Sequence, residues 1–326
     1  MTGTQDPAAR WRSEDGQKLA EEVVAHLLAG RPLGHLDLGD HDGRVDLRGL
    51  QFPQPKRLRR FEEEGWFIEE LSDRVAFNDA RLEGLDLSGA VLDAVRLCDT
   101  RVDDCRFDGA RWQHLGMVRT SLLRSSFAGA DLRQAALGTW VDGGNVFEQV
   151  SFVGADLRIG SCPAATFVDS DFSDARLEKV DFQSSSFVRC RFAGELREVT
   201  FYDHGFKTGK PDPNPMEDVD FGDAVLRDVE FRRLNLDRVT FPRDADHLVV
   251  RRYRCVLERA DAALASMDLA AARRLRAGIQ HRLKWAGPEQ EVGVFSLADY
   301  GRRGGPELAE LAAEVLRRSE SECLGT

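Results

Sequence analysis

The chain has 326 residues, of which 42% are hydrophobic and 31% charged, and its formal net charge is −11. This composition is typical of a folded, water-soluble protein, and the acidic balance disfavours direct binding to nucleic acid, whose phosphates would repel it. No apolar run approaches the roughly 18 residues of a membrane span. The N-terminal stretch MTGTQDPAARWRSEDGQ lacks the apolar core of a signal peptide.

The six cysteines include no CxxC pair, and their scatter indicates neither a zinc site nor a disulfide framework. We therefore expect a reduced, cytoplasmic protein that needs no metal and no cofactor.

The first predicted element is an amphipathic helix over residues 14–29. Its apolar residues fall on one face, and Gly30 and Pro32 come after it as stop signals. We assign residues 1–35 to an N-terminal capping helix. Residues 36–74 are predicted to form a first partial coil, interrupted by a short helical insertion at KRLRRFEEEGWFIEEL (56–71).

A period of five residues dominates the chain from Phe77 to Phe192. We call the 24 positions at this five-residue spacing the beat. All of them but Asp142 and Cys162 are large and apolar, whereas a 42% hydrophobic content predicts about 10 hydrophobic residues among 24. A second series, two residues earlier, is mostly small. Neither a helix nor a strand has this period. It predicts a chain that turns one corner every five residues, with four segments per coil and coils stacked about 4.8 Å apart.

Several stretches resemble the pentapeptide-repeat family, whose pattern is A(D/N)LXX: AGADL (128–132), VGADL (153–157), GLDLSG (84–89) and SDARL (173–177). The resemblance covers residues 75–242 and implies a mainly β fold, a right-handed quadrilateral β-helix. Past Phe192 the beat moves by one residue, which indicates a one-residue deletion near AGELREV. The segment KTGKPDPNPMED (207–218) breaks the pattern and is predicted to be a projecting loop.

Residues 243–326 are predicted to form a C-terminal α-helical cap or domain. Apolar residues recur at helical spacing from Val249, Asp268 is a candidate N-cap, and Pro306 can open the last helix. Residues 247–285 carry nine Lys or Arg against three acidic residues, a local charge of +6. These basic helices could bind an acidic partner, dock onto the solenoid, or be solvated.

The sequence contains no motif of a hydrolase, a nucleotide-binding loop or a metalloprotease, and the seven histidines show no ligand spacing. DHDG (40–43) is interpreted as a surface turn. We therefore expect no enzymatic activity.

One irregular place remains, around AALGTWVDGGNVFEQV (135–150). With 20 residues per coil, Asp142 and Cys162 would stack, as would Trp140 and Gly160. We interpret this place as a candidate partner or ligand patch, with a repacked bulge that leaves Asp142 in water as the structural alternative. Its residues are Leu123, Trp140, Val141, Asp142, Gly143, Gly144, Gly160, Cys162 and Pro163.

The favoured function is a non-catalytic scaffold that binds a macromolecular partner. The family resemblance implies an alternative, a mimic of duplex DNA that binds a type II topoisomerase (gyrase) and gives resistance or self-protection. The mixed signs at outward positions, with Arg96, Arg101, Arg106 and Arg111 in one coil, weaken it. A remote alternative is small-molecule binding or catalysis around Trp140 and Asp142. A composition rich in Arg, Ala, Gly and Asp resembles that of a high-GC bacterium.

Overall fold

The computed structural model describes residues 6–55, 57–63, 66–72, 74–141, 143–203, 214–288 and 290–325. The chain divides into two compact units, Met1–Arg176 and Leu177–Thr326, each described here by itself. Among the described residues, no helix is both long enough and apolar enough to cross a membrane.

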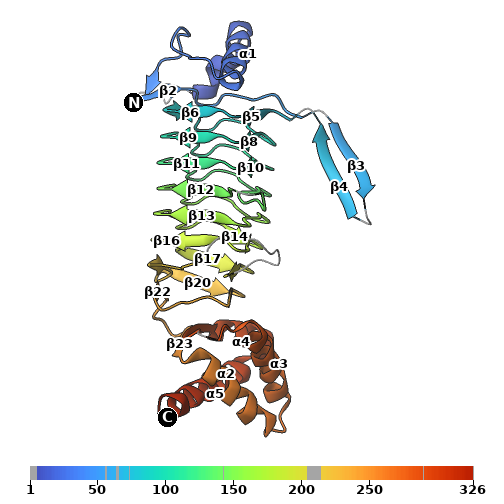
Figure 1. Ribbon diagram of the computed structural model, residues 1–326, viewed down its shortest axis with the longest axis vertical. Coiled ribbons are helices and arrows are strands. Elements are labelled where there is room, and N and C mark those ends of the chain that lie inside the picture. The colour runs from blue at the N-terminus through green and yellow to red at the C-terminus, as the bar shows by residue number, and fades with distance from the viewer. Residues whose placement is uncertain are drawn as a thin grey trace. The chain divides into compact units, whose positions relative to one another are not determined.

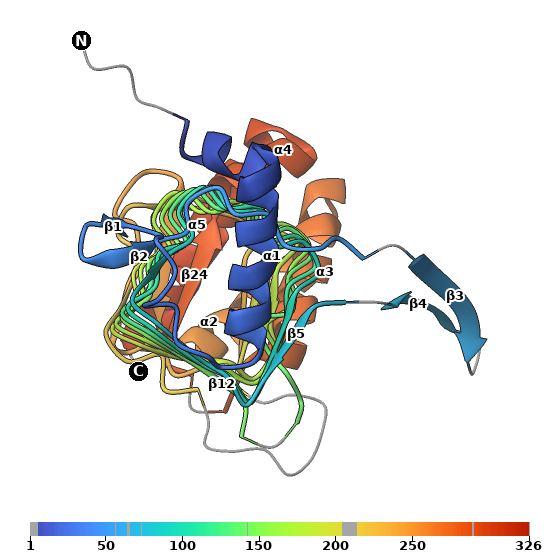
Figure 2. The ribbon, with the colours of Figure 1, turned by 90° about the horizontal axis from the view of Figure 1, so that it is seen from above.

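The first unit begins with the 3-10 helix η1 (Pro7–Arg12) and helix α1 (Glu14–Leu28). The hydroxyl of Ser13 caps α1 by accepting a hydrogen bond from the amide of Gly16, and the helix buries Val23, Val24 and Leu27. The predicted amphipathic helix is confirmed here. Figure 2 shows α1 lying across the end of the coils of this unit.

The first coil starts with an antiparallel hairpin of β1 (Asp40–His41) and β2 (Arg44–Asp46). Strand β2 then pairs in parallel with β7 (Leu85–Asp86) of the next coil. The amides of Leu47 and Phe52 continue this pairing by donating to the carbonyls of Asp86 and Val91.

The predicted helical insertion at 56–71 is wrong. Strands β3 (Arg57–Glu63) and β4 (Trp66–Ser72) form an antiparallel hairpin instead, and Glu63 pairs with Trp66. Trp66, Phe67 and Ile68 have a high strand propensity. A two-residue connection is also the commonest hairpin length. The apolar positions of this short segment fit either structure, so their spacing alone misassigned it.

The repeats form short strands and single bridges that pair in parallel with the equivalent residues one coil away (Figure 1). Leu82 pairs with Val102, and Val102 with Leu122, so a regular coil has 20 residues. The remaining strands of the first unit are β5 (Ala76–Asn78), β6 (Arg81–Glu83), β8 (Arg96–Cys98), β9 (Arg101–Asp103), β10 (Gly116–Val118), β11 (Ser121–Leu123), β12 (Asn145–Glu148) and β13 (Ala165–Val168).

The core of the coils is a set of stacked columns made by the residues on the beat. Phe127 stacks on Phe107 at 4.9 Å between ring centroids and on Phe152 at 5.5 Å, and Phe152 stacks on Phe172 at 4.8 Å. All four rings are fully buried. The corners between faces adopt left-handed backbone angles, as at Asp99 with a φ of 51°.

The second unit continues the repeat with two changes of register. Leu177 pairs with Leu196, one residue short of a regular coil, so the predicted deletion is present. Leu196 pairs with Leu226, which adds ten residues to the next coil. The strands are β14 (Leu177–Glu178), β15 (Asp181–Phe182), β16 (Ser186–Val188), β17 (Gly194–Arg197), β18 (Thr200–Tyr202), β19 (Val219–Asp220), β20 (Ala224–Arg227), β21 (Glu230–Arg232) and β22 (Val239–Thr240).

The predicted loop at 207–218 lies mostly outside the described residues, which resume at Asn214. Glu217 already bridges to Val188, so the end of this segment has rejoined a coil.

The described residues of the C-terminal region form four helices, α2 (Tyr253–Ala265), α3 (Ala270–Trp285), α4 (Leu297–Gly304) and α5 (Pro306–Leu324). Two unpredicted strands, β23 (His247–Arg251) and β24 (Val292–Ser296), pair antiparallel. Val249 therefore lies in a strand and not in a helix. Asp268 does not cap α3, whose N-cap is Leu269; its carboxylate pairs with Arg273 at 2.9 Å instead.

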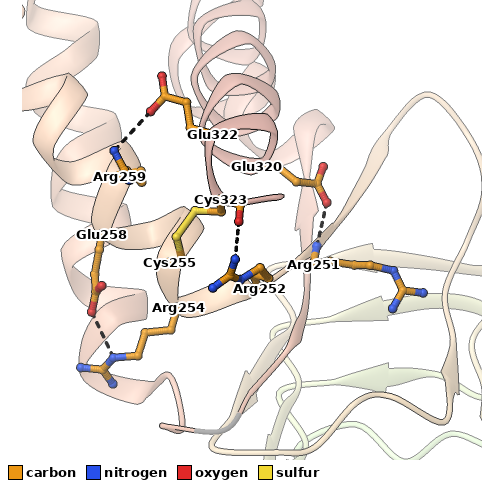
Figure 3. Close-up of a disulfide and its surroundings, with 9 residues drawn as sticks. All are labelled: Arg251, Arg252, Arg254, Cys255, Glu258, Arg259, Glu320, Glu322 and Cys323. Atoms are coloured by element: carbon orange, nitrogen blue, oxygen red, sulfur yellow. Dashed lines mark hydrogen bonds and ion pairs between the residues drawn. A yellow bond between two sulfur atoms is a disulfide. The ribbon is translucent and has the colours of Figure 1, made fainter. Parts of the chain in front are cut away.

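A disulfide joins Cys255 of α2 to Cys323 of α5 (Figure 3), contrary to the expectation of unpaired cysteines. The two residues are 68 positions apart and meet because α2 and α5 pack together, with Val256 and Leu316 in their common core. Arg259 and Glu322 add an ion pair between the same two helices at 3.9 Å.

We predict that reducing this disulfide destabilises the second unit by about 2–4 kcal/mol, because a long loop in the unfolded chain loses its constraint. Urea unfolding with and without dithiothreitol measures the difference. The C255S/C323S double variant is the control and should not respond to the reductant. Equal midpoints for the oxidised and reduced wild-type protein would contradict the prediction.

Candidate functional site

The irregular stretch around Trp140 is a five-residue insertion in one coil of the first unit. Ser121 pairs with Val146, a spacing of 25 residues, whereas Val146 pairs with Thr166 at the regular spacing of 20. Ala136 still pairs with Ser161 at a spacing of 25. The extra residues therefore leave the coil after Ala136 and return before Val146. We call residues 138–145 the insertion loop.

This register corrects the predicted stacking. Because Ala136 pairs with Ser161, Cys162 stacks above Leu137 and not above Asp142. Gly160 likewise stacks above Ala135 and not above Trp140. Five inserted residues are one whole period, so the apolar residues after the insertion keep the same five-residue spacing as those before it. The insertion therefore cannot be seen in the periodicity of the sequence.

Asn145 closes the insertion loop from inside the protein. Its side chain is fully buried, its Oδ1 accepts from the amide of Thr120 at 2.9 Å, and its Nδ2 donates to the carbonyls of Met117 and Leu137 at 3.1 and 2.8 Å. The amide group thus replaces ladder hydrogen bonds that the detour interrupts. Sequence reasoning missed this residue, although an Asn in a small, buried position was a visible signal.

Only part of the predicted patch lies together. Val141 is 45% exposed, Gly143 is exposed, and Trp140 is half-buried in the same loop. Gly144 and Pro163 lie beside them, since a side chain at Gly144 would meet the carbonyl of Ala164 and one at Gly138 the backbone of Pro163.

The other members of the predicted patch do not join that surface. Leu123 pairs with Glu148 at the far end of β12 from the loop, and Gly160 and Cys162 are buried. Asp142 lies outside the described residues.

The outward faces of the coils carry charges that neutralise each other. Arg111 pairs with Asp93 at 2.7 Å, Arg133 with Asp131 at 2.8 Å, and the same arrangement recurs along the first unit. The hydrogen bond from Arg133 lowers the pKa of Asp131 to about 2, so this carboxylate stays ionised and paired. Further pairs are Arg101–Asp103, Arg106–Asp42, Arg119–Asp99 and Arg158–Asp156. These faces therefore carry many charges that are paired with a neighbour of opposite sign.

The DHDG segment forms the turn of the β1–β2 hairpin and places His41 against a buried carboxylate. His41 Nδ1 lies 2.6 Å from Asp86 Oδ2, and the amide and hydroxyl of Ser88 both donate to Asp86 Oδ1. Burial raises the pKa of Asp86, but hydrogen bonds from Ser88 and His41 and the charge of Arg106 outweigh it, and the net pKa is lowered. Ser88 contacts the carboxylate and not the imidazole, so these groups lack the order of a hydrolytic triad.

Many basic side chains of the C-terminal helices are paired within the second unit. Arg276 contacts Asp261 at 2.8 Å, and the guanidinium of Arg282 lies over the ring of Phe295 at 4.7 Å. His281 reaches Glu230 of β21 at 3.3 Å. These side chains are therefore held by contacts inside the unit, and His281 links α3 to the last coils.

One group of potential ligands was missed by the sequence analysis. Glu22 and His26 of α1 and His35 of the segment after it place one potential ligand atom each within 4.8 Å of one another. His26 and His35 are nine positions apart, and only the turn after α1 brings their rings together.

A protein-family model matches part of the chain. Residues 77–111 match the family model of pentapeptide repeats, with 8 copies. No curated protein matches the chain.

Three solved structures of pentapeptide-repeat proteins are similar in part. Rfr23 from the cyanobacterium Cyanothece 51142 has 10% identity and a TM-score of 0.30, over 51% of this chain and 90% of that one. QnrB1, a plasmid-mediated fluoroquinolone resistance protein, has 10% identity and a TM-score of 0.28, over 57% and 91%. HetL from Nostoc sp. strain PCC 7120, involved in heterocyst differentiation regulation, has 14% identity and a TM-score of 0.26, over 68% and 93%.

Residues 77–111 thus carry pentapeptide repeats, as the five-residue period predicts. The matched repeats form coils of the first unit, which also carries the insertion loop.

We predict that Asn145→Ala destabilises the first unit by about 2–4 kcal/mol, because it leaves the amide of Thr120 and two carbonyls buried without partners. Chemical unfolding measures the change. Asn78→Ala is the matched control, since Asn78 is exposed on β5 and should change stability by less than about 0.5 kcal/mol. A loss no larger at Asn145 than at Asn78 would show that the amide does not close the loop.

Proposed function

We propose that this chain is a non-catalytic scaffold that presents the insertion loop to a protein partner. The observation that carries the proposal is the register: one coil is lengthened by five residues, and the added residues include the exposed Val141 and the half-buried Trp140. Binding residues are found disproportionately on loops held by a rigid framework. The framework here is a closely packed stack of aromatic side chains. The insertion loop lies outside that stack, so packing of the core does not dictate its residues.

In the same proposal, the helical segments protect the ends of the repeat. Helix α1 covers the first coil, and the preceding η1 contacts that coil through Trp11, whose indole donates to the carbonyl of Arg48 at 2.8 Å. In the second unit, Asp299 of α4 accepts from the amide of Asp228 at 2.7 Å. Residues 1–35 and 243–326 would then be caps that prevent edge-to-edge association of the strands, and residues 75–242 the right-handed quadrilateral β-helix.

Deleting residues 139–143 tests the role of the loop without disturbing the repeat. Gly138 and Gly144 would then take the places that Val118 and Arg119 hold one coil earlier, and Gly144 already has a left-handed φ of 54°, close to the 46° of Arg119. We predict that the deletion variant keeps its fold and its thermal midpoint within a few degrees but loses its partner.

A photo-crosslinking amino acid placed at position 141 tests the proposed interface. When the variant is expressed in the native host and irradiated, a protein bound at the loop becomes covalently attached and can be identified. The control places the same residue at position 159, which is 62% exposed in the same unit. We expect a specific crosslink from position 141 that excess wild-type protein abolishes and the deletion variant does not. Equal crosslinking from both positions, or equal competition by the deletion variant, would remove the loop from the interface.

The alternative function is a DNA mimic that binds a type II topoisomerase. The net charge of −11 favours it, because such a mimic must be acidic. The paired charges of the first unit weigh against it, since Asp93 and Asp131 each have an arginine as a direct partner. Small-molecule binding or catalysis around Trp140 and Asp142 is a remote alternative, and the deletion variant would abolish it as well.

We predict that the purified protein neither inhibits the supercoiling activity of DNA gyrase nor protects it from a quinolone. A supercoiling assay with gyrase from a related host measures both effects. Inhibition or protection by the wild-type protein at micromolar concentration would establish the alternative. The deletion variant would then show whether that activity depends on the insertion loop.

A further inference from the structure

The N-terminal helix and the segment after it bring together three side chains that commonly bind transition metals. Glu22 and His26 are four residues apart and therefore lie on the same face of α1. His35 comes from the next segment, and its ring lies 4.7 Å from that of His26 between centroids, at an interplanar angle of 46°. One potential ligand atom of each side chain lies within 4.8 Å of the others.

A contact with a backbone carbonyl orients the ring of His26 and fixes which of its nitrogens can bind a metal. Its Nδ1 lies 3.2 Å from the carbonyl oxygen of Pro32. A carbonyl can only accept a hydrogen bond, so this contact places the proton on Nδ1 and leaves the lone pair of Nε2 available. Hydrogen bonds from the second ring nitrogen to a carbonyl are the usual way in which proteins orient a metal-binding histidine.

The three side chains are accessible to a metal ion from solvent. Glu22 and His35 are exposed and His26 is half-buried. None of the three forms an ion pair with any residue in the described part of the chain. A cation shared by the two imidazoles would bind both.

We propose that Glu22, His26 and His35 form a binding site for one divalent transition metal ion of the zinc class. Two imidazoles and a carboxylate are a ligand set that Zn²⁺ accepts, with the fourth tetrahedral position left to water or to a partner's side chain. The site links α1 to the segment that contains the buried Leu33 and Leu38 and leads into the first coil. Metal binding would therefore fasten α1 to the coils. The site is independent of the insertion loop.

Zinc titration of the metal-free full-length chain tests the proposal, with affinity purification through a C-terminal tag that contains no histidine. Isothermal titration calorimetry should show one Zn²⁺ per chain for the wild type. His26→Ala and His35→Ala should each weaken binding at least roughly 100-fold and Glu22→Gln at least roughly tenfold. His114→Asn is the matched control, because His114 is exposed on another part of the same unit and should leave the affinity unchanged.

A second readout separates loss of the site from loss of the fold. Zn²⁺ should raise the thermal midpoint of the wild type and of His114→Asn, and the rise should vanish in His35→Ala, whose circular dichroism should match that of the wild type. Absence of zinc binding by the wild type, or equal affinity in the His35→Ala and His114→Asn variants, would overturn the proposal.

Discussion

The structure depends on one packing constraint: each five-residue segment must send one large apolar side chain into a narrow interior. Phe127 shows why, because it contacts the ring below it, the ring above it and the neighbouring Trp112 at 6.3 Å. Such close packing fixes the distance between coils, and that distance is the one at which backbone amides reach the carbonyls of the next coil. Core packing and backbone hydrogen bonding therefore specify the same register.

This packing constraint does not restrict the residue types at the outward positions. It does restrict how a coil can be lengthened. A detour interrupts hydrogen bonds inside the stack, and a buried Asn restores them. Asn145 does so in the first unit. In the second unit Asn214 comes after the longer detour, and its Oδ1 accepts from the amides of Phe187 and Met216, each at 3.1 Å. Each insertion is thus followed by a buried Asn whose Oδ1 accepts from a backbone amide of the preceding coil, although only the Nδ2 of Asn145 also donates to backbone carbonyls.

Periodicity in the sequence predicted the repeated part of the fold, but the sequence predicted little that depends on distant contacts. The beat identified the repeat and the shift after Phe192, and helical spacing identified α1. The beat misplaced Asp142 and Cys162 in one column because an insertion of one whole period is invisible to phase. The Cys255–Cys323 disulfide and the approach of His26 to His35 both require a tertiary fold, and no local pattern records either.

The insertion loop is held against the coil by its two ends, and this bears on what it can do. A β-carbon at Gly138 would lie 2.1 Å from the carbonyl oxygen of Pro163, and one at Gly144 would lie 2.9 Å from that of Ala164. Both backbone positions therefore press on the next coil, and neither leaves room for a side chain. Trp140 and Val141 therefore lie between two anchored backbone positions, and a partner that bound them would meet a loop whose ends are already ordered.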